Sequence, residues 1–100
     1  MSQEIGNFFV GETIPVYAEF REDGVLTDPS TVKIYVTTMG GTNVVTNQGM
    51  TSESTGLYYY NLALENAGQY DITIVYTDTL SRKRARIMYL VAVQPLQVIQ

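Results

Sequence analysis

Apolar and polar residues alternate along most of this chain, and that alternation limits its fold more than any other feature. The clearest case is Ile14–Phe20, IPVYAEF, in which every second residue is apolar and points to one face. The same period of two returns in Val32–Thr38 and in Tyr70–Thr77, and no segment shows the 3.6-residue period of an amphipathic helix. The chain is therefore predicted to be all-β.

Turn signals separate these runs at intervals of about 8–12 residues, a spacing typical of an antiparallel β-sandwich. Val44–Thr46 reads as a short edge strand and Asn47–Ser54 as a polar loop. Because Pro15 cannot donate a ladder hydrogen bond, the strand that contains it is expected to begin at an edge or to have a free side there. Further strands are expected at Ile5–Val10, Leu57–Leu64 and Arg82–Val93. About seven strands result, which favours a sandwich and leaves an up-and-down barrel as the alternative.

The length of 100 residues corresponds to one domain, and the 45% of apolar residues can fill one core. No interior linker divides the chain, so residues 1–100 are expected to form a single immunoglobulin-like domain. Residues 1–11 and 94–100 are expected to be arms that are flexible or bound to a partner. The longest apolar run, Ile87–Val93, has the length of a strand and is far shorter than a membrane span.

The chain contains no Cys and no His. It therefore lacks the commonest general base, the commonest transition-metal ligand and any thiolate. The acidic residues of the turns fit turn chemistry and match no dedicated calcium loop: Glu22, Asp23, Asp28 and Asp78. We expect no enzymatic activity, no cofactor and no resident metal.

Charge is unevenly distributed along the sequence. The net charge is −4, yet Arg82, Lys83, Arg84 and Arg86 lie within five residues. A globally acidic chain is a poor ligand for the phosphate backbone, so no nucleic-acid partner is expected. The basic segment either blunts a strand edge, pairs within the protein or docks on an acidic partner surface. These four residues are candidate partner contacts.

The C-terminal segment QPLQVIQ adds a second candidate contact. Its apolar residues follow Pro95 after the last predicted strand, where no core is left for them to fill: Leu96, Val98 and Ile99. Such a segment can add to a partner's sheet or lie in its groove. Self-association into a homo-oligomer is also left open.

Three consecutive tyrosines in Thr55–Leu62, TGLYYYNL, raise the question of a stacking platform. Successive strand residues face opposite sides, so Tyr58 and Tyr60 share a face that Tyr59 does not. The three rings therefore cannot form one flat platform. Tyr58 and Tyr60 are expected to face the core, and Tyr59 to lie outside beside Tyr17 or Tyr35.

The segment ENAGQYDI at Glu65–Ile72 is similar to the Asp-x-Gly-x-Tyr-x-Cys corner of immunoglobulin domains. Gly68 and Tyr70 match the pattern, while Asn66 and Ile72 stand where the acid and the cysteine would be. The resemblance implies that Tyr70 buries its ring and returns its hydroxyl to nearby backbone.

A wider resemblance covers roughly residues 12–93. The order of TDPS, KIYV, TGLYYYNL and AGQYDITIVYTD is similar to that of bacterial, archaeal and phage immunoglobulin-like modules, in particular minor structural proteins of tailed phages. It implies a non-enzymatic virion component that decorates the capsid or bridges head or tail subunits. Its partners would be other structural proteins, such as a major capsid or tail protein. It would lie in the virion, after assembly in the host cytoplasm, and the absence of a secretory signal agrees with that. The alternative is a carbohydrate- or cell-surface-binding module cut from a larger adhesin.

Overall fold

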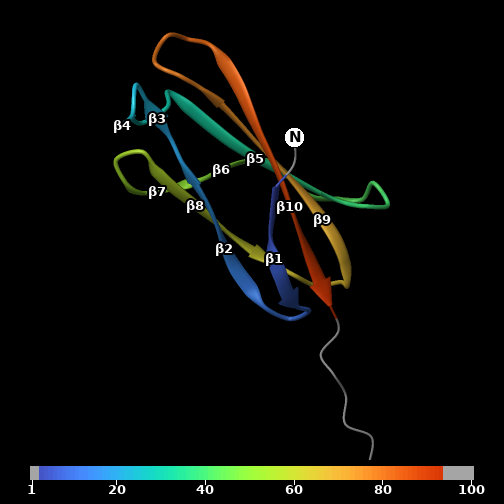
Figure 1. The fold of residues 1–100 in the computed structure, drawn as a ribbon. Helices are drawn as coiled ribbons and strands as arrows, with labels where there is room; N and C mark the ends of the chain where they lie inside the picture. The colour runs from blue at the N-terminus through green and yellow to red at the C-terminus, as the bar shows by residue number, and fades with distance from the viewer. Residues whose placement is uncertain (1–2, 94–100) are drawn as a thin grey trace, which may run out of the picture.

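The computed structural model describes residues 3–93, in which strands are joined by turns and no helix occurs (Figure 1). Within that range there is consequently no helix that could cross a membrane. The strands, in chain order, are β1 (Gln3–Phe9), β2 (Thr13–Glu19), β3 (Arg21–Glu22), β4 (Val25–Leu26), β5 (Thr31–Thr38), β6 (Asn43–Gly49), β7 (Thr51–Ser54), β8 (Leu57–Ala63), β9 (Gly68–Thr77) and β10 (Lys83–Val93).

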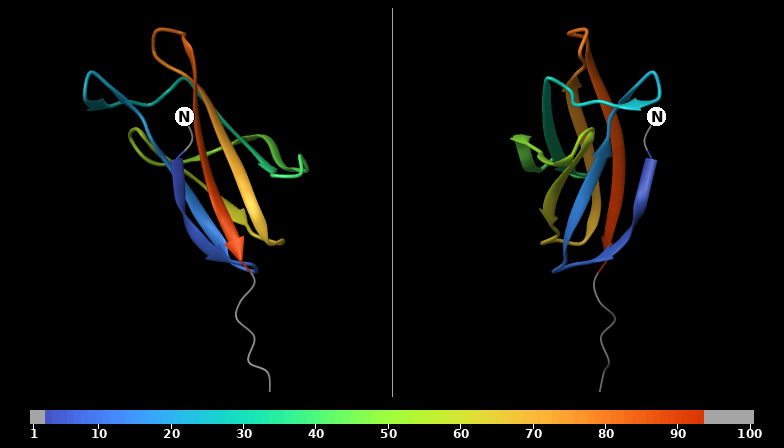
Figure 2. Two further views of the ribbon diagram at one scale, coloured as in Figure 1. Left: turned by 45° about the vertical axis from the view of Figure 1, so that its right-hand side comes forward. Right: turned by 90° about the vertical axis from the view of Figure 1, so that its left-hand side faces the viewer.

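Two main sheets form a sandwich. One has five strands in the order β1-β10-β9-β5-β6, and the other has three in the order β2-β8-β7. Figures 1 and 2 show the two sheets lying face to face, with the small β3–β4 hairpin projecting at one end. The predicted immunoglobulin-like β-sandwich is confirmed. The barrel alternative is wrong, because the strands belong to separate sheets with open edges.

One strand pair departs from the expected antiparallel arrangement. Strand β1 runs parallel to β10, with Phe8 beside Ala92 and Phe9 beside Val93. A parallel pair needs a long connection, and here almost the whole chain lies between the two strands. The predicted strand at Ile5–Val10 thus covers the edge of β10, and most of the expected N-terminal arm, residues 1–11, lies in β1 and the turn after it.

The inward-facing residues of both sheets form one hydrophobic core. In β2 the predicted register holds, because Val16 and Ala18 are buried while Tyr17 and Glu19 are exposed. The buried apolar residues are Ile14, Val16, Ala18, Phe20, Ile34, Val36, Val45, Leu62, Leu64, Tyr70, Ile72, Ile74, Leu90 and Ala92.

The predicted loop at Asn47–Ser54 is wrong, because most of it belongs to strands β6 and β7. Both strands lie at a free edge of their sheets, and seven of the eight residues in this segment are exposed. An exposed edge strand does not need alternating apolar residues, so its polar sequence resembles a loop. The turn that contains Asp23 is flanked by two short paired strands, and together they form the β3–β4 hairpin.

The tyrosine run lies in β8 as its period of two predicts. Tyr58 and Tyr60 are partly buried against the core, and Leu62 continues that face at 1% exposure. Tyr59 faces outward and its ring lies beside that of Tyr17, with ring centroids 5.9 Å apart and planes inclined by 47°. The three tyrosines therefore contribute packing contacts on both faces of the sheet that contains β8.

Tyr70 closes the end of the sandwich at which β8 turns into β9. Its ring is buried, and its hydroxyl donates to the Asn66 carbonyl at 2.9 Å and accepts from the Asn66 amide at 3.1 Å. Gly68 begins β9 with a φ of 129°, which favours glycine. This pair of backbone hydrogen bonds satisfies the one polar atom of an otherwise apolar side chain.

Candidate functional site

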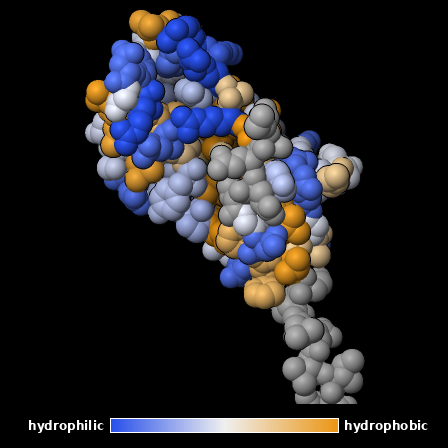
Figure 3. Space-filling view, viewed as in Figure 1, coloured by the Kyte–Doolittle hydropathy of each residue, from blue (hydrophilic) through white to orange (hydrophobic). Residues whose placement is uncertain are grey.

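A cleft opens at the opposite end of the sandwich, between the β3–β4 hairpin and the β9–β10 turn. Figures 1 and 2 show both segments at this end of the molecule. The cavity has a volume of about 510 Å³. We call it the end cleft, and it is lined by Phe20, Arg21, Glu22, Asp23, Thr27, Pro29, Tyr76, Asp78, Leu80, Arg82 and Arg84. In Figure 3 hydrophilic side chains gather over this end, with hydrophobic ones at its rim.

Aromatic rings form the floor of the end cleft. Phe20, from the end of β2, packs on Tyr76 of β9 with ring centroids 4.6 Å apart and on Tyr58 at 5.6 Å. The Arg86 guanidinium lies 5.2 Å from the Phe20 ring centroid and 5.7 Å from that of Tyr76. Arg86 is therefore held by cation–π contacts to both rings, below the groups that line the opening.

Asp78, in the β9–β10 turn, is the anchor of one wall. It is 4% exposed. Its Oδ1 accepts from the backbone N–H groups of Leu80 at 3.0 Å and Arg82 at 2.9 Å. Its Oδ2 accepts from the Nε atoms of Arg82 at 2.8 Å and Arg84 at 3.1 Å. The Arg82 amide contributes most to lowering the Asp78 pKa from 3.8 to about 2, and both guanidinium groups lower it further.

Arg82 and Arg84 keep most of their hydrogen-bonding capacity. Each uses only Nε toward Asp78, and the terminal nitrogens of both have no hydrogen-bond partner within residues 3–93. Their side chains are 54% and 48% exposed, whereas the Asp78 side chain is 5% exposed. The carboxylate thus fixes two guanidinium groups side by side while their outer N–H donors remain accessible.

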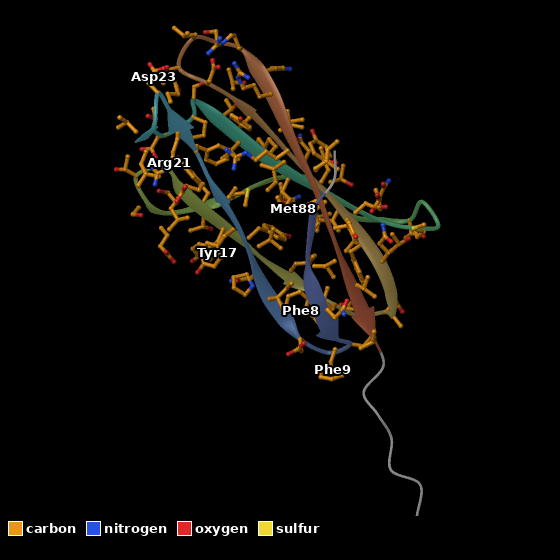
Figure 4. All side chains as sticks on the ribbon, in the orientation of Figure 1. Phe8, Phe9, Tyr17, Arg21, Asp23 and Met88 are labelled. Atoms are coloured by element: carbon orange, nitrogen blue, oxygen red, sulfur yellow. The ribbon has the colours of Figure 1, made fainter. Side chains whose placement is uncertain are left out.

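The β3–β4 hairpin supplies the other wall, where Figure 4 shows Arg21 and Asp23. Arg21 donates to Glu19 at 2.8 Å and to the Gly24 carbonyl at 2.8 Å. Glu22 accepts from the Thr79 hydroxyl at 2.5 Å and from its amide at 3.2 Å, so it connects the hairpin to the β9–β10 turn. The two walls are joined at one side by this contact.

Gly56 holds the base of the hairpin in place. Its carbonyl accepts from the Phe20 amide at 2.7 Å, and its own amide donates to Asp28 at 2.7 Å. Its φ of 75° favours glycine, and a Cβ here would lie 2.8 Å from the Phe20 carbonyl oxygen. The β7–β8 turn therefore fixes where the hairpin wall stands.

The structure separates the candidate contacts into three groups. Arg82 and Arg84 line the end cleft, Arg86 lies over the two aromatic rings of its floor, and Lys83 projects from the opposite face of β10 beside Thr77. Strand β1 pairs with β10 only between Met88 and Val93, so within the described residues the basic stretch of β10 has a neighbouring strand, β9, on one side only. The interpretation as charges that blunt an edge therefore stays a prediction. Leu96, Val98 and Ile99 lie outside the described residues.

Sequence reasoning missed several residues of this cleft. Asp78, Glu22 and Asp28 were assigned to turn chemistry alone, yet they anchor arginines, join the walls and hold Gly56. One local signal was available, since an Asp four residues before Arg82 can accept from the backbone that follows it. No local signal indicates that Phe20 meets Tyr76, because that contact joins the two sheets.

Metal ligands are scarce in this chain. It has no His and no Cys, and no group of three or more Asp or Glu residues within the described range could hold a metal ion. Imidazole and thiolate are the donors that most transition-metal sites require. Aromatic stacking is limited as well, because the exposed pair Tyr17 and Tyr59 is inclined rather than coplanar.

Comparisons with known proteins identify the fold. No protein-family model matches the sequence, and no curated protein matches it. Among solved structures, CopC from Methylosinus trichosporium OB3b matches with a TM-score of 0.71 and 11% sequence identity, over 99% of this chain and 91% of that chain. At this identity the likeness establishes a shared β-sandwich.

The assignment to minor structural proteins of tailed phages is wrong. The structural match to CopC from Methylosinus trichosporium OB3b overturns the virion function, the capsid, head and tail roles and the virion localisation. The motifs that carried the resemblance are turn and core motifs, which specify a sandwich, and one sandwich fold serves many functions.

Proposed function

We propose that this chain is a non-catalytic binding module that holds a carboxylate of a protein partner in the end cleft. The observation that carries the proposal is the pair of guanidinium groups fixed on Asp78 by Nε alone. Two accessible sets of terminal N–H donors in one place match the geometry of a carboxylate, which accepts bidentate hydrogen bonds.

The other residues that line the cleft favour a short peptide segment as the class of ligand. Glu22 and Asp23 line the same cleft and would repel a polyphosphate, with its several charges, more strongly than a single carboxylate, and the net charge of −4 also disfavours nucleic acid. Apolar side chains at Phe20, Pro29 and Leu80 offer contact to an apolar neighbour of the carboxylate. The volume is that of a typical ligand pocket.

The cleft chemistry favours binding over the other functions considered. The likeness to CopC concerns the fold alone, and the imidazole and thiolate donors of many transition-metal sites are absent from this chain, so the proposal rests on the cleft and not on a metal. A hydrolase that acts through a Ser or Thr nucleophile would need a general base to activate it, and the chain has no His for that role.

The test is titration of the full chain with a short peptide that carries one Glu between Leu and Val, compared with the same peptide carrying Gln. We expect the Glu peptide to bind more tightly, and we expect Arg84→Gln to weaken it about 10–100-fold, the value of a charge-assisted hydrogen bond. Lys83→Gln is the matched control, because it removes the same charge from the opposite face of β10. Equal binding of the two peptides, or equal losses in the two variants, would overturn the proposal.

A further inference from the structure

From Ile87 to Val93, strand β10 is apolar on both faces, although only one face packs into the sandwich. Leu90 and Ala92 point inward and are buried. The outward face carries only apolar or aromatic residues after Lys83, and these are Ala85, Ile87, Tyr89, Val91 and Val93. A strand in a two-layer sandwich normally has a polar outer face, and apolar residues on both faces are typical of strands that are covered on both sides.

Neighbouring strands widen this apolar surface. Val75 of β9 lies beside Ala85, and Phe9 of β1 lies beside Val93. Ile87 is 48% exposed and Phe9 50% exposed. Figure 4 places Phe9 at the end of β1, and in Figure 3 hydrophobic side chains gather where β1 and β10 end. We call this surface the outer stripe: Phe9, Val75, Ala85, Ile87, Tyr89, Val91 and Val93.

We propose that the outer stripe is the interface between two copies of this chain, packed face to face with their strands antiparallel. Lys33 and Asp71 lie on the same outer face, toward opposite ends of it, because Lys33 pairs with Val75 and Asp71 with Tyr89. A twofold axis across the row of Ile87, Thr73 and Tyr35 brings the Lys33 end of one copy over the Asp71 end of the other. The face is therefore complementary to itself, as a twofold interface requires.

The area of the outer face is sufficient for a dimer. Five strands spaced by about 4.8 Å, over nine residues that each rise about 3.4 Å, cover roughly 700 Å² on each copy. The two copies together would bury about 1,400 Å², which lies within the range of stable protein–protein interfaces. The outer face combines an apolar stripe along β10 with polar and charged residues on β9 and β5, and protein–protein interfaces likewise combine apolar and polar area.

The chain's own C-terminal residues are a less suitable cover. Residues 94–100 follow directly on Val93, so they would have to reverse direction to lie along β10. Seven residues extend at most about 23 Å, and the reversal uses part of that length. The distance from Val93 back to Ala85 is about 27 Å at the rise of a strand. A second copy covers the whole stripe, and this segment does not.

The test is sedimentation equilibrium of the full chain and its variants. We expect the wild-type chain to dimerise at about 10–100 µM, and Ile87→Glu to raise the dimer dissociation constant at least about 100-fold, because the charge is introduced twice at the centre of the interface. Met39→Glu is the control, since Met39 is 72% exposed in the β5–β6 turn. Circular dichroism verifies that each variant is folded.

A charge exchange makes the test independent of whether Ile87→Glu folds. Lys33→Glu should weaken the dimer about tenfold, the size of one interfacial charge effect, and Lys33→Glu combined with Asp71→Lys should restore it. Peptide binding in the end cleft should persist in the monomeric variants, because neither residue lines it. A monomeric wild type at about 100 µM, or no restoration by the exchange, overturns the proposal. Tighter dimerisation of a chain ending at Val93 also overturns it, because residues 94–100 would then cover the stripe.

Discussion

The two ends of strand β9 are closed by different kinds of interaction. At its start, the Tyr70 ring is buried and its hydroxyl both donates to and accepts from Asn66, so few groups remain to bind a ligand. At its other end, the Asp78 carboxylate accepts hydrogen bonds from four donors, and only one nitrogen of each of two arginines is among them. The first end contributes stability, and the second leaves hydrogen-bond donors for a ligand.

This contrast also explains why the charges are tolerated between two apolar sheets. Three arginines project toward the interior side of β10, yet only one carboxylate contacts them directly. Arg86 is placed over the Phe20 and Tyr76 rings instead, where the ring quadrupoles replace a counter-ion. The aromatic floor therefore separates the charged cleft from the fully apolar core below it.

The largest expected effect is a loss of stability when Tyr70, at the closed end of the sandwich, is replaced. Tyr70→Ala should lower the free energy of unfolding by about 3–5 kcal/mol, because it removes a large core aromatic. Tyr70→Phe should cost about 0.5–1.5 kcal/mol, the net value of the hydroxyl's hydrogen bonding. Urea unfolding measures both. Ligand binding by the folded fraction should be unchanged in both variants, and an unaltered stability of the alanine variant would contradict the role of the corner.

A smaller effect is expected where the β7–β8 turn supports the cleft. Gly56→Ala should cost about 1–3 kcal/mol, because the side chain would be strained at a φ of 75° and would press on the Phe20 carbonyl. Gly24→Ala is the matched control, since Gly24 has a φ of 80° and nothing within 4 Å of an added Cβ. Thermal unfolding of both variants isolates the contact. The contact is unimportant if the two losses are equal.

How much of the fold and of the cleft could be predicted depends on how far apart in the sequence the interacting residues lie. The core register of Ile14–Phe20 and the Tyr70 corner depend on residues close in sequence, and local patterns were sufficient to predict them. The segment Asn47–Ser54, which contributes to the edge strands β6 and β7, lacked a pattern, because seven of its eight residues are exposed. The end cleft combines β2, a hairpin and the β9–β10 turn, so the inward direction of Arg84 and the contact of Glu22 with Thr79 required the structure.

The basic segment shows the same limit. The repulsion among its cations was expected to be offset by acids on a neighbouring strand or on a partner. It is offset in part by Asp78, which lies in the turn immediately before the segment. Alternation predicts that Arg82, Arg84 and Arg86 share one face of the strand. It cannot tell whether that face points into the sandwich or to solvent.

The smallest expected effect appears only in acid and is confined to the cleft end. The folded-state pKa of Asp78 is about 2, against an ordinary value of 3.8, so its ionised form is stabilised by folding. That stabilisation is complete above pH 3.8 and is lost as the pH falls through 2. The melting temperature of the wild-type chain should therefore fall between these pH values. Asp78→Asn should have a lower melting temperature at neutral pH and a shallower fall in acid, because the titrating group is absent.

Thr79→Val is the control, because it keeps Asp78 and removes the hydroxyl contact to Glu22. Its melting temperature should fall with pH as steeply as that of the wild-type chain. An equally steep fall in Asp78→Asn would contradict the role of Asp78. Hydrogen exchange at the Leu80 and Arg82 amides, which donate to Asp78, should accelerate in the same pH interval relative to the Asn66 amide at the other end of the sandwich.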